Sequence, residues 1–225
     1  MPKVKEVDRV ELLIFDLDGT LIDTAEDIRD ALNHALSPYG YSRLSTEETK
    51  RLVGDGVPKL IEKIIGKGKR EFDEIRERFL SYYTAHIADK SRPYRDVIET
   101  LQRLEGYKKA VVTNKKEALS VELLEKTGLY GFFDLVVGAD TTAEQKPSPV
   151  PVRYVLERLN VRPEQALMIG DGPTDIEAGK RAGVRTVAVG YGFKELTLLE
   201  GADYVIRDSI KELIPLLERL GGKAG

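Results

Sequence analysis

The sequence predicts an α/β fold, in which a doubly wound parallel sheet is interrupted after its first strand by a small all-helical insert. From residue 92 onward, short β-rich apolar runs alternate with helical stretches, which is typical of a parallel sheet with helices on its faces. Between residues 22 and 90, apolar side chains instead recur at spacings of three and four, and we see no good strand run. We therefore expect a Rossmann-like core made of residues 1–20 and 92–225, with residues 21–91 as a helical domain.

The first strand is predicted from VELLIFDLD (10–18), which is apolar nearly throughout. Such a strand belongs in the middle of a parallel sheet, because helices cover both of its sides. The insert that follows has helical spacing, as in Ile28, Leu32 and Leu36. About four helices are expected, because three turn-forming stretches break the pattern. These are PYGYS (38–42), VGDGVP (53–58) and GKGK (66–69).

After the insert, strands and helices are predicted to follow one another along the rest of the chain. The strand runs are short and apolar, as in KKAVV and RTVAV, and the helical stretches separate most of them. The predicted strands cover residues 108–114, 134–138, 166–170, 185–189 and 202–206. The predicted helices lie near residues 94–104, 117–127, 149–159, 174–182 and 209–220.

The composition argues against several classes of partner. Lys and Arg number 35 and Asp and Glu number 38, so the formal charge of −3 gives no long-range attraction for nucleic acid or for an anionic membrane. No apolar run approaches the ~20 residues that span a bilayer, and the start, MPKVKEVDRVE, is too charged for a signal peptide. The absence of Cys fits a reducing compartment. We expect a cytoplasmic protein without nucleic-acid or membrane partners.

Polar residues follow four of the predicted elements, where ligands bind in open parallel sheets. Taken singly, each group has an ordinary structural explanation: an Asp-Gly turn, a helix N-cap, a solvated loop lysine, or acids at the start of a helix. Nothing structural requires all four groups at one edge of the sheet. The four groups are Asp16 with Asp18, Thr113 with Asn114, Lys146, and Asp171 with Asp175.

These residue types suit phosphoryl transfer. Asp16 and Asp18 are two apart in an extended segment, so their side chains can address one small volume. Adding Asp171 brings together three acids with no His or Cys nearby, and such a set suits a hard cation such as Mg²⁺. The hydroxyl, amide and ammonium groups of Thr113, Asn114 and Lys146 are the donors that a phosphate dianion needs.

The sequence resembles the haloacid dehalogenase-like hydrolase superfamily, and within it the phosphoglycolate phosphatase type. The resemblance covers nearly the whole chain, and the helical insert occupies the place of that family's small cap domain. Four ordered motifs carry it: DLDGT (16–20), VVTN (111–114), Lys146 in QKPSP, and GDGPTD (170–175). One departure is that Gly172 and Pro173 follow GD, where many relatives carry Ser or Thr.

The resemblance implies a Mg²⁺-dependent phosphatase that acts through an aspartyl-phosphate. Asp16 would be the nucleophile, and Asp18 would be first the acid and then the base. The implied metal ligands are Asp16, the backbone carbonyl at Asp18, and Asp171, with Asp175 close by. The implied phosphate-binding groups are Gly19, Thr113, the backbone near Asn114, and Lys146, of which Lys146 also restrains the acids. Within the cap, Gly54, Asp55, Gly56 and Lys59 are candidates for specificity contacts.

The expected substrate is a small phosphorylated metabolite, with 2-phosphoglycolate, hydrolysed to glycolate and phosphate, as the leading choice. A pyrophosphatase or another small-metabolite or sugar phosphatase of the same fold is the runner-up. Asp18 argues against a haloalkanoic acid dehalogenase, because a halide leaving group needs no acid. A mutase would need an Arg or His in the insert to reorient its bisphosphate, and we see no convincing candidate there. A non-catalytic receiver-like binding protein is the alternative from a different class, and the choice between monomer and homodimer stays open.

Overall fold

The computed structural model describes residues 9–221 and has a six-stranded parallel sheet at its centre. Its strands are β1 (Leu12–Phe15), β4 (Lys108–Val112), β5 (Leu135–Val137), β6 (Ala166–Gly170), β7 (Arg185–Val189) and β8 (Tyr204–Ile206). They are arranged in the order β5-β4-β1-β6-β7-β8, which places β1 in the middle, as its apolar sequence predicts.

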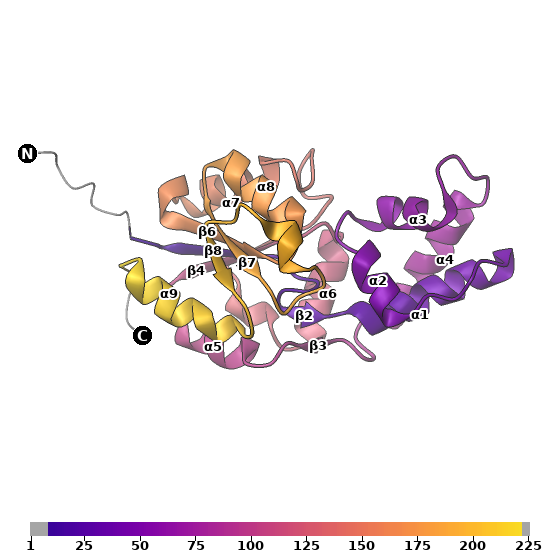
Figure 1. The fold of residues 1–225 in the computed structure, drawn as a ribbon, viewed down its shortest axis with the longest axis horizontal. Helices are drawn as coiled ribbons and strands as arrows, with labels where there is room; N and C mark the ends of the chain where they lie inside the picture. The colour runs from indigo at the N-terminus through magenta and orange to yellow at the C-terminus, as the bar shows by residue number, and fades with distance from the viewer. Residues whose placement is uncertain (1–8, 222–225) are drawn as a thin grey trace, which may run out of the picture.

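Helices cover both faces of this sheet, with α7 and α8 above it and α5 and α9 below it in the view of Figure 1. The helices of this part are α5 (Val97–Arg103), α6 (Glu117–Lys126), α7 (Val150–Leu159), α8 (Pro173–Ala182) and α9 (Leu213–Arg219). Short 3-10 helices are formed by Tyr130–Phe132, Pro163–Gln165, Leu196–Leu199 and Ile210–Glu212.

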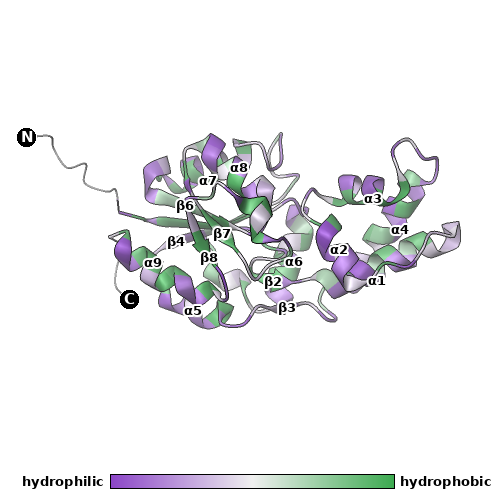
Figure 2. Ribbon diagram, viewed as in Figure 1, coloured by the Kyte–Doolittle hydropathy of each residue, from purple (hydrophilic) through white to green (hydrophobic). Residues whose placement is uncertain are grey.

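The burial of β1 explains why both faces need helices. All four of its residues are fully buried, with Leu13 and Phe15 in one hydrophobic cluster and Leu12 and Ile14 in another. The first cluster includes side chains of α5, α6 and α9, and the second includes side chains of α7 and α8. Figure 2 shows the central strands in the green of hydrophobic residues, whereas the helices carry both colours. Successive residues of β1 therefore face opposite sides of the sheet, and each side needs a covering layer of helices.

Four helices lie between β1 and the rest of the sheet in the chain, and Figure 1 shows them beyond the end of β1. Helix α1 packs against α2 and α4, and α3 packs against α4. A two-residue antiparallel pair, β2 with β3, lies where the chain leaves the sheet and returns. These elements are β2 (Ile22–Asp23), α1 (Ala25–Leu36), a 3-10 helix (Ser37–Tyr39), α2 (Thr46–Leu52), α3 (Val57–Ile65), α4 (Phe72–Ala85) and β3 (Arg92–Pro93).

The predicted order of elements is confirmed, and three details were wrong. The stretch from residue 22 is not helical at its start, because Ile22 and Asp23 form β2, which is too short for a sequence pattern. The first strand ends at Phe15 rather than residue 18, because the chain turns there. Helix α5 begins at Val97, after Asp96 in a left-handed conformation with φ of 69°.

The division of the chain at residues 21 and 91 stays a prediction. Residues 1–8 and 222–225, which were assigned to the core, lie outside the described residues. Between residues 9 and 221, no helix has both the length and the apolar character that a membrane span requires.

Candidate active site

A tight turn after β1 presents the first pair of acids. The ladder continues through Asp16, whose N–H donates to the Ile169 carbonyl at 2.9 Å. Gly19 then adopts φ of 87°, and a Cβ at this position would collide with the carboxylate of Asp171. The N–H of Gly19 donates to the Ile22 carbonyl at 2.9 Å, so it is engaged within the turn. Gly19 therefore makes room for Asp171, and its predicted role as a phosphate donor gains no support from this geometry.

Lys146 is buried beneath this turn and joins two acids. Its Nζ lies 2.8 Å from Asp16 Oδ1, 2.6 Å from Asp175 Oδ1 and 2.5 Å from the Val112 carbonyl oxygen. Burial lowers the pKa of Lys146, but the charges of Asp16 and Asp175 outweigh burial and hold it above its ordinary value. An ammonium has three N–H donors, and all three are engaged here. In this arrangement Lys146 orients Asp16 and neutralises part of the acidic charge.

Three carboxylates converge above Lys146. Oxygen atoms of Asp16, Asp171 and Asp175 all lie within 4.8 Å of one another. Asp171 accepts hydrogen bonds from the Thr20 hydroxyl at 3.0 Å and from the Phe193 N–H at 2.7 Å. Burial, and then the charge of Asp175, raise the pKa of Asp16 to about 7. Burial, and then the charges of Asp16 and Asp175, raise that of Asp171 to about 8.

This donor set fits a hard divalent cation. All three groups offer carboxylate oxygens, which are the ligands that Mg²⁺ prefers. Each carboxylate has about four lone-pair sites, so the oxygens of Asp171 can bind a cation while accepting their present hydrogen bonds. The raised pKa values reflect burial first and then repulsion between crowded negative charges, and a cation would relieve the repulsion. Asp175, predicted only to lie nearby, is thus inside the acidic cluster.

Asp18 is held by residues that the sequence did not single out. Its Oδ1 accepts hydrogen bonds from the Thr24 hydroxyl and from Lys115 Nζ, each at 2.7 Å. Lys115 also donates to the hydroxyl of Tyr83, a residue of α4, at 2.8 Å. Burial lowers the pKa of Lys115, but the charge of Asp18 outweighs burial and holds it above its ordinary value. Asp18 therefore belongs to a network distinct from that of Asp16.

Thr113 and Asn114 follow β4, and their side chains make different hydrogen bonds. The Thr113 Oγ1 accepts from the Lys115 N–H at 3.2 Å, so its hydroxyl hydrogen can still be donated to a phosphate oxygen. The side-chain amide of Asn114 donates to the Gly54 carbonyl at 2.9 Å and to the Lys146 carbonyl at 3.0 Å. Both of its donors are therefore used, and the backbone N–H is what Asn114 can offer to phosphate.

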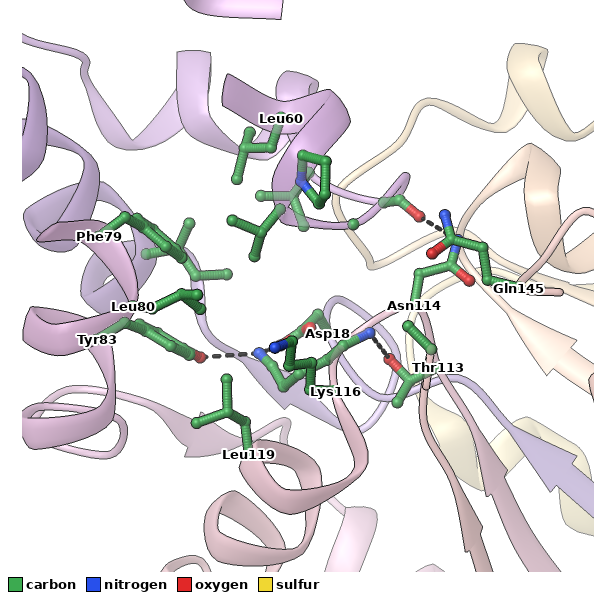
Figure 3. Close-up of a pocket in the computed structure, with 18 of the residues that line it drawn as sticks. Asp18, Leu60, Phe79, Leu80, Tyr83, Thr113, Asn114, Lys116, Leu119 and Gln145 are labelled. Carbon is green, nitrogen blue, oxygen red and sulfur yellow. Dashed lines mark hydrogen bonds and ion pairs between the residues drawn. The ribbon is translucent and has the colours of Figure 1, made fainter. Parts of the chain in front are cut away.

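A cavity of about 470 Å³ lies between these polar groups and the helical insert. Figure 3 shows Leu60, Phe79 and Leu80 on one side of it and Asp18 and Thr113 on the other. The cavity therefore has a polar end and an apolar end.

The insert contacts the core across this cavity. The amide of Gln145 donates to the Asp55 carbonyl at 3.0 Å, and Lys194 Nζ donates to the Lys50 and Arg51 carbonyls at 2.9 and 2.6 Å. Together with the bond from Asn114 to Gly54, these contacts hold the start of α3 over the site.

The four residues predicted in the cap have different positions. Gly54 and Gly56 line the cavity, and both have a positive φ that favours glycine. The carboxylate of Asp55 instead pairs with Lys63 at 2.6 Å. Lys59 is exposed and is not part of the cavity lining. The backbone of the Gly54 to Gly56 turn is therefore the part of this prediction that has a place at the site.

Lys115, Tyr83 and Thr24 are the site residues that the sequence did not reveal. Lys115 directly follows VVTN, so its position next to a motif could have identified it as a site residue. Tyr83 gave no signal, because one apolar residue among many on an amphipathic helix looks like part of the core. Thr24 precedes α1 and resembled an ordinary helix start.

Known proteins share this sequence and fold. The family model for haloacid dehalogenase-like hydrolases matches residues 13–189. A phosphoglycolate phosphatase of Aquifex aeolicus is 43% identical over 189 residues, covering 83% of this chain and 88% of that protein. One of Mesorhizobium japonicum is 38% identical over 222 residues, covering 95% and 98%.

Solved structures agree with this assignment. The crystal structure of a predicted phosphoglycolate phosphatase from Haemophilus somnus has a TM-score of 0.86 and 28% identity, and the match covers 92% of this chain and 97% of that one. Because the family model spans most of the sequence and these relatives match it nearly end to end, the chain belongs to the haloacid dehalogenase-like hydrolase family.

Proposed function

We propose that this protein is a Mg²⁺-dependent phosphatase that hydrolyses 2-phosphoglycolate to glycolate and phosphate through a covalent intermediate on Asp16. The observation that carries the proposal is the convergence of Asp16, Asp171 and Asp175 around Lys146, with Asp16 lining the cavity. The relatives named above are phosphoglycolate phosphatases, which supports the choice of substrate.

In the first step, Asp16 attacks phosphorus. Its Oδ1 accepts a hydrogen bond from Lys146, whereas no described residue donates to its other oxygen, and Asp16 lines the cavity. The bond between phosphorus and the ester oxygen breaks as the new bond forms, which yields an aspartyl-phosphate and a departing alkoxide. Splitting one displacement into two in this way is the usual gain from covalent catalysis. Thr113 and the backbone at Asn114 would donate to the phosphate oxygens.

Asp18 gives its proton to the departing alkoxide and later takes one from the attacking water. Thr24 and Lys115 hold its Oδ1 in place, and Asp18 lines the same cavity as Asp16. In the second step the water oxygen bonds to phosphorus and the bond to Asp16 breaks, which regenerates the free carboxylate and releases phosphate. General acid–base help of this kind typically contributes about 10²–10⁴-fold.

Mg²⁺ would be held by Asp16 and Asp171, with the backbone carbonyl of Asp18 as a further ligand. Asp175 would support these ligands through Lys146 and its hydrogen bond from the Gly172 N–H at 2.9 Å. When bound, the ion supplies positive charge that offsets the crowded carboxylates and the phosphate oxygens. We also propose that the partner is a small phosphorylated metabolite. The protein is proposed to be cytoplasmic, because the absence of Cys fits a reducing compartment, in which disulfides are rare.

The far end of the cavity favours a carbon-containing leaving group over pyrophosphate. Apolar side chains, Leu60, Phe79 and Leu80 among them, surround that end. Glycolate carries one negative charge into this mostly apolar region, whereas a second phosphate would carry more, and loss of water is costly for a charged group. This observation favours a phosphomonoester over the runner-up, pyrophosphate.

We expect phosphate release from 2-phosphoglycolate to be fastest in a panel that also contains pyrophosphate and several sugar phosphates. The assay is run with Mg²⁺ and with EDTA, and EDTA should reduce turnover to background because the acidic cluster then has no counter-charge. Fastest phosphate release from pyrophosphate would instead favour a pyrophosphatase, the runner-up. Turnover that persisted in EDTA would contradict the proposed metal dependence.

Mg²⁺ is expected to stabilise the fold more at high pH than at low pH. The folded-state pKa values of Asp16 and Asp171, about 7 and about 8, lie above the unfolded value of 3.8. Their contribution to stability is therefore complete below 3.8 and is lost as pH rises through 7 to 8 in metal-free protein. At a metal concentration ~100 times Kd, Mg²⁺ adds about 2.7 kcal/mol, or about 5–10 °C in Tm for a chain of this size.

The measurement is Tm in EDTA and in Mg²⁺ at about pH 5, where the protonated form of the cluster dominates, and at about pH 9, where the ionised form dominates. The gain from Mg²⁺ should be several degrees at the higher pH and small at the lower. Asp171→Asn should lose the gain, and Asp55→Asn, whose carboxylate pairs with Lys63, should keep it. An equal gain at both pH values, or in Asp171→Asn, would contradict this assignment of the metal site.

A further inference from the structure

The buried ammonium of Lys115 lies where the leaving group of a substrate would sit. Its side chain is 6% exposed and bridges Asp18 of the core and Tyr83 of α4. The Tyr83 hydroxyl accepts a hydrogen bond from Lys115, and Figure 3 shows Tyr83 with its hydroxyl directed toward the centre of the site. Lys115 is therefore a fixed positive charge between the proposed acid and the apolar end of the cavity.

Lys115 has bonding capacity that its protein partners do not use. An ammonium carries three N–H donors, and the described residues accept two of them, at Asp18 Oδ1 and the Tyr83 hydroxyl. Lys146, the other buried lysine of the site, has all three donors engaged. Because Lys115 lines the cavity, its third donor is available to a ligand there.

Lys115 is also the one buried cation among the described residues that line this cavity. Lys116 and Arg76 line it too, but both are exposed, and Arg76 pairs with Asp73 at 2.9 Å. An ion pair formed in a site shielded from water is stronger than one on the surface. A negative group at this end of the cavity would therefore bind to Lys115 rather than to the rim.

We infer that Lys115 is a specificity-determining residue, which selects phosphomonoesters whose leaving group carries a carboxylate next to the ester-bearing carbon. The geometry follows from small-molecule chemistry. The ester oxygen must lie within hydrogen-bonding distance of Asp18 to receive its proton, and Lys115 Nζ lies 2.7 Å from Asp18 Oδ1. In 2-phosphoglycolate a single methylene separates the ester oxygen from the carboxylate carbon, so the carboxylate reaches the third donor of Lys115. The inference rests on the proposed function and deepens it.

The test compares 2-phosphoglycolate with 2-hydroxyethyl phosphate, in which a neutral hydroxymethyl group replaces the carboxylate. The wild-type protein should prefer 2-phosphoglycolate in kcat/KM. Because a hydrogen bond to a charged group is lost, Lys115→Met should reduce this preference by about 10- to 100-fold. Lys115→Met also removes the contact between Lys115 and Asp18, which lowers turnover of both esters by a common factor. That factor cancels in the ratio of the two kcat/KM values. Lys116→Met removes an exposed cation from the same cavity and should leave the ratio within about threefold of wild type.

A second measurement uses the wild-type protein alone. Glycolate should inhibit competitively at a concentration about 10-fold or more below that required for ethylene glycol, because only glycolate carries the carboxylate. An unchanged ratio of the two esters in Lys115→Met, or equal inhibition by the two alcohols, would overturn the inference while leaving the phosphatase activity in place. Wild-type protein that hydrolysed neither ester would instead overturn the proposed function, and this inference with it.

Discussion

Asp16→Asn is expected to abolish phosphate release, with a loss of about 10⁴-fold or more, as when a covalent nucleophile is removed from other enzymes. An amide oxygen is a poor nucleophile, and the substitution also removes one of the three acids at the proposed metal site. The measurement is phosphate release from 2-phosphoglycolate at saturating Mg²⁺. Activity within about tenfold of wild type would contradict the assignment of Asp16 as nucleophile.

The fold of Asp16→Asn should remain intact, which separates a lost nucleophile from a lost structure. Lys146 keeps Asp175 and the Val112 carbonyl as partners, and asparagine has nearly the same size as aspartate. Removing one carboxylate also relieves the repulsion that raises the pKa of Asp171. In EDTA at about pH 8, the Tm of this variant should therefore equal or exceed that of the wild type.

Asp18→Asn is expected to lower kcat by about 10²–10⁴-fold for an alkyl phosphate, because an amide can neither protonate the alkoxide nor activate water. The size of the loss in the first step depends on the leaving group. An aryl ester such as p-nitrophenyl phosphate leaves as a stable phenolate without a proton, so its bond to phosphorus should still break rapidly in the variant. The measurement is the pre-steady-state release of p-nitrophenol compared with that of glycolate.

Two controls accompany this comparison. Asp55→Asn removes a carboxylate from the cap loop, one that pairs with Lys63 and does not line the cavity, and it should keep both rates near wild type. Thr24→Val removes one of the two donors to Asp18 while leaving its carboxylate, and it should have a smaller effect than Asp18→Asn. Equal loss of p-nitrophenol and glycolate release in Asp18→Asn would argue that Asp18 acts only as a support.

The sheet and the acids at its edge were predictable because each depends on local sequence. Apolar runs revealed the strands, and Asp16, Asp18 and Asp171 follow strands whose carboxyl ends must share one edge. The pairing of Lys146 with Asp175 was not predictable, because it depends on how a loop folds beneath the sheet edge. Strands β2 and β3 contain two residues each, which is too few for any periodic signal.

Contacts between the insert and the core could not be predicted from the sequence. Tyr83 lies in α4 and Lys115 lies in the loop after β4, 32 residues away, so nothing local relates them. The side-chain amide of Asn114 was expected to bind phosphate, but it donates to the carbonyls of Gly54 and Lys146, which come from distant parts of the chain. The sequence therefore indicated which residues lie at the edge of the sheet, but it did not indicate which partners their side chains contact.

The central claim is that phosphate passes through a covalent bond to Asp16, and capture of that bond tests it most directly. Wild-type protein with Mg²⁺ is mixed with 2-phosphoglycolate, quenched in acid within the first turnover, and examined by intact mass and peptide mapping. The account predicts a single phosphoryl group on the peptide that contains Asp16, absent in EDTA and in Asp16→Asn. Release of phosphate at the wild-type rate with no phosphorylated protein at any quench time, or with the group on another residue, would contradict it.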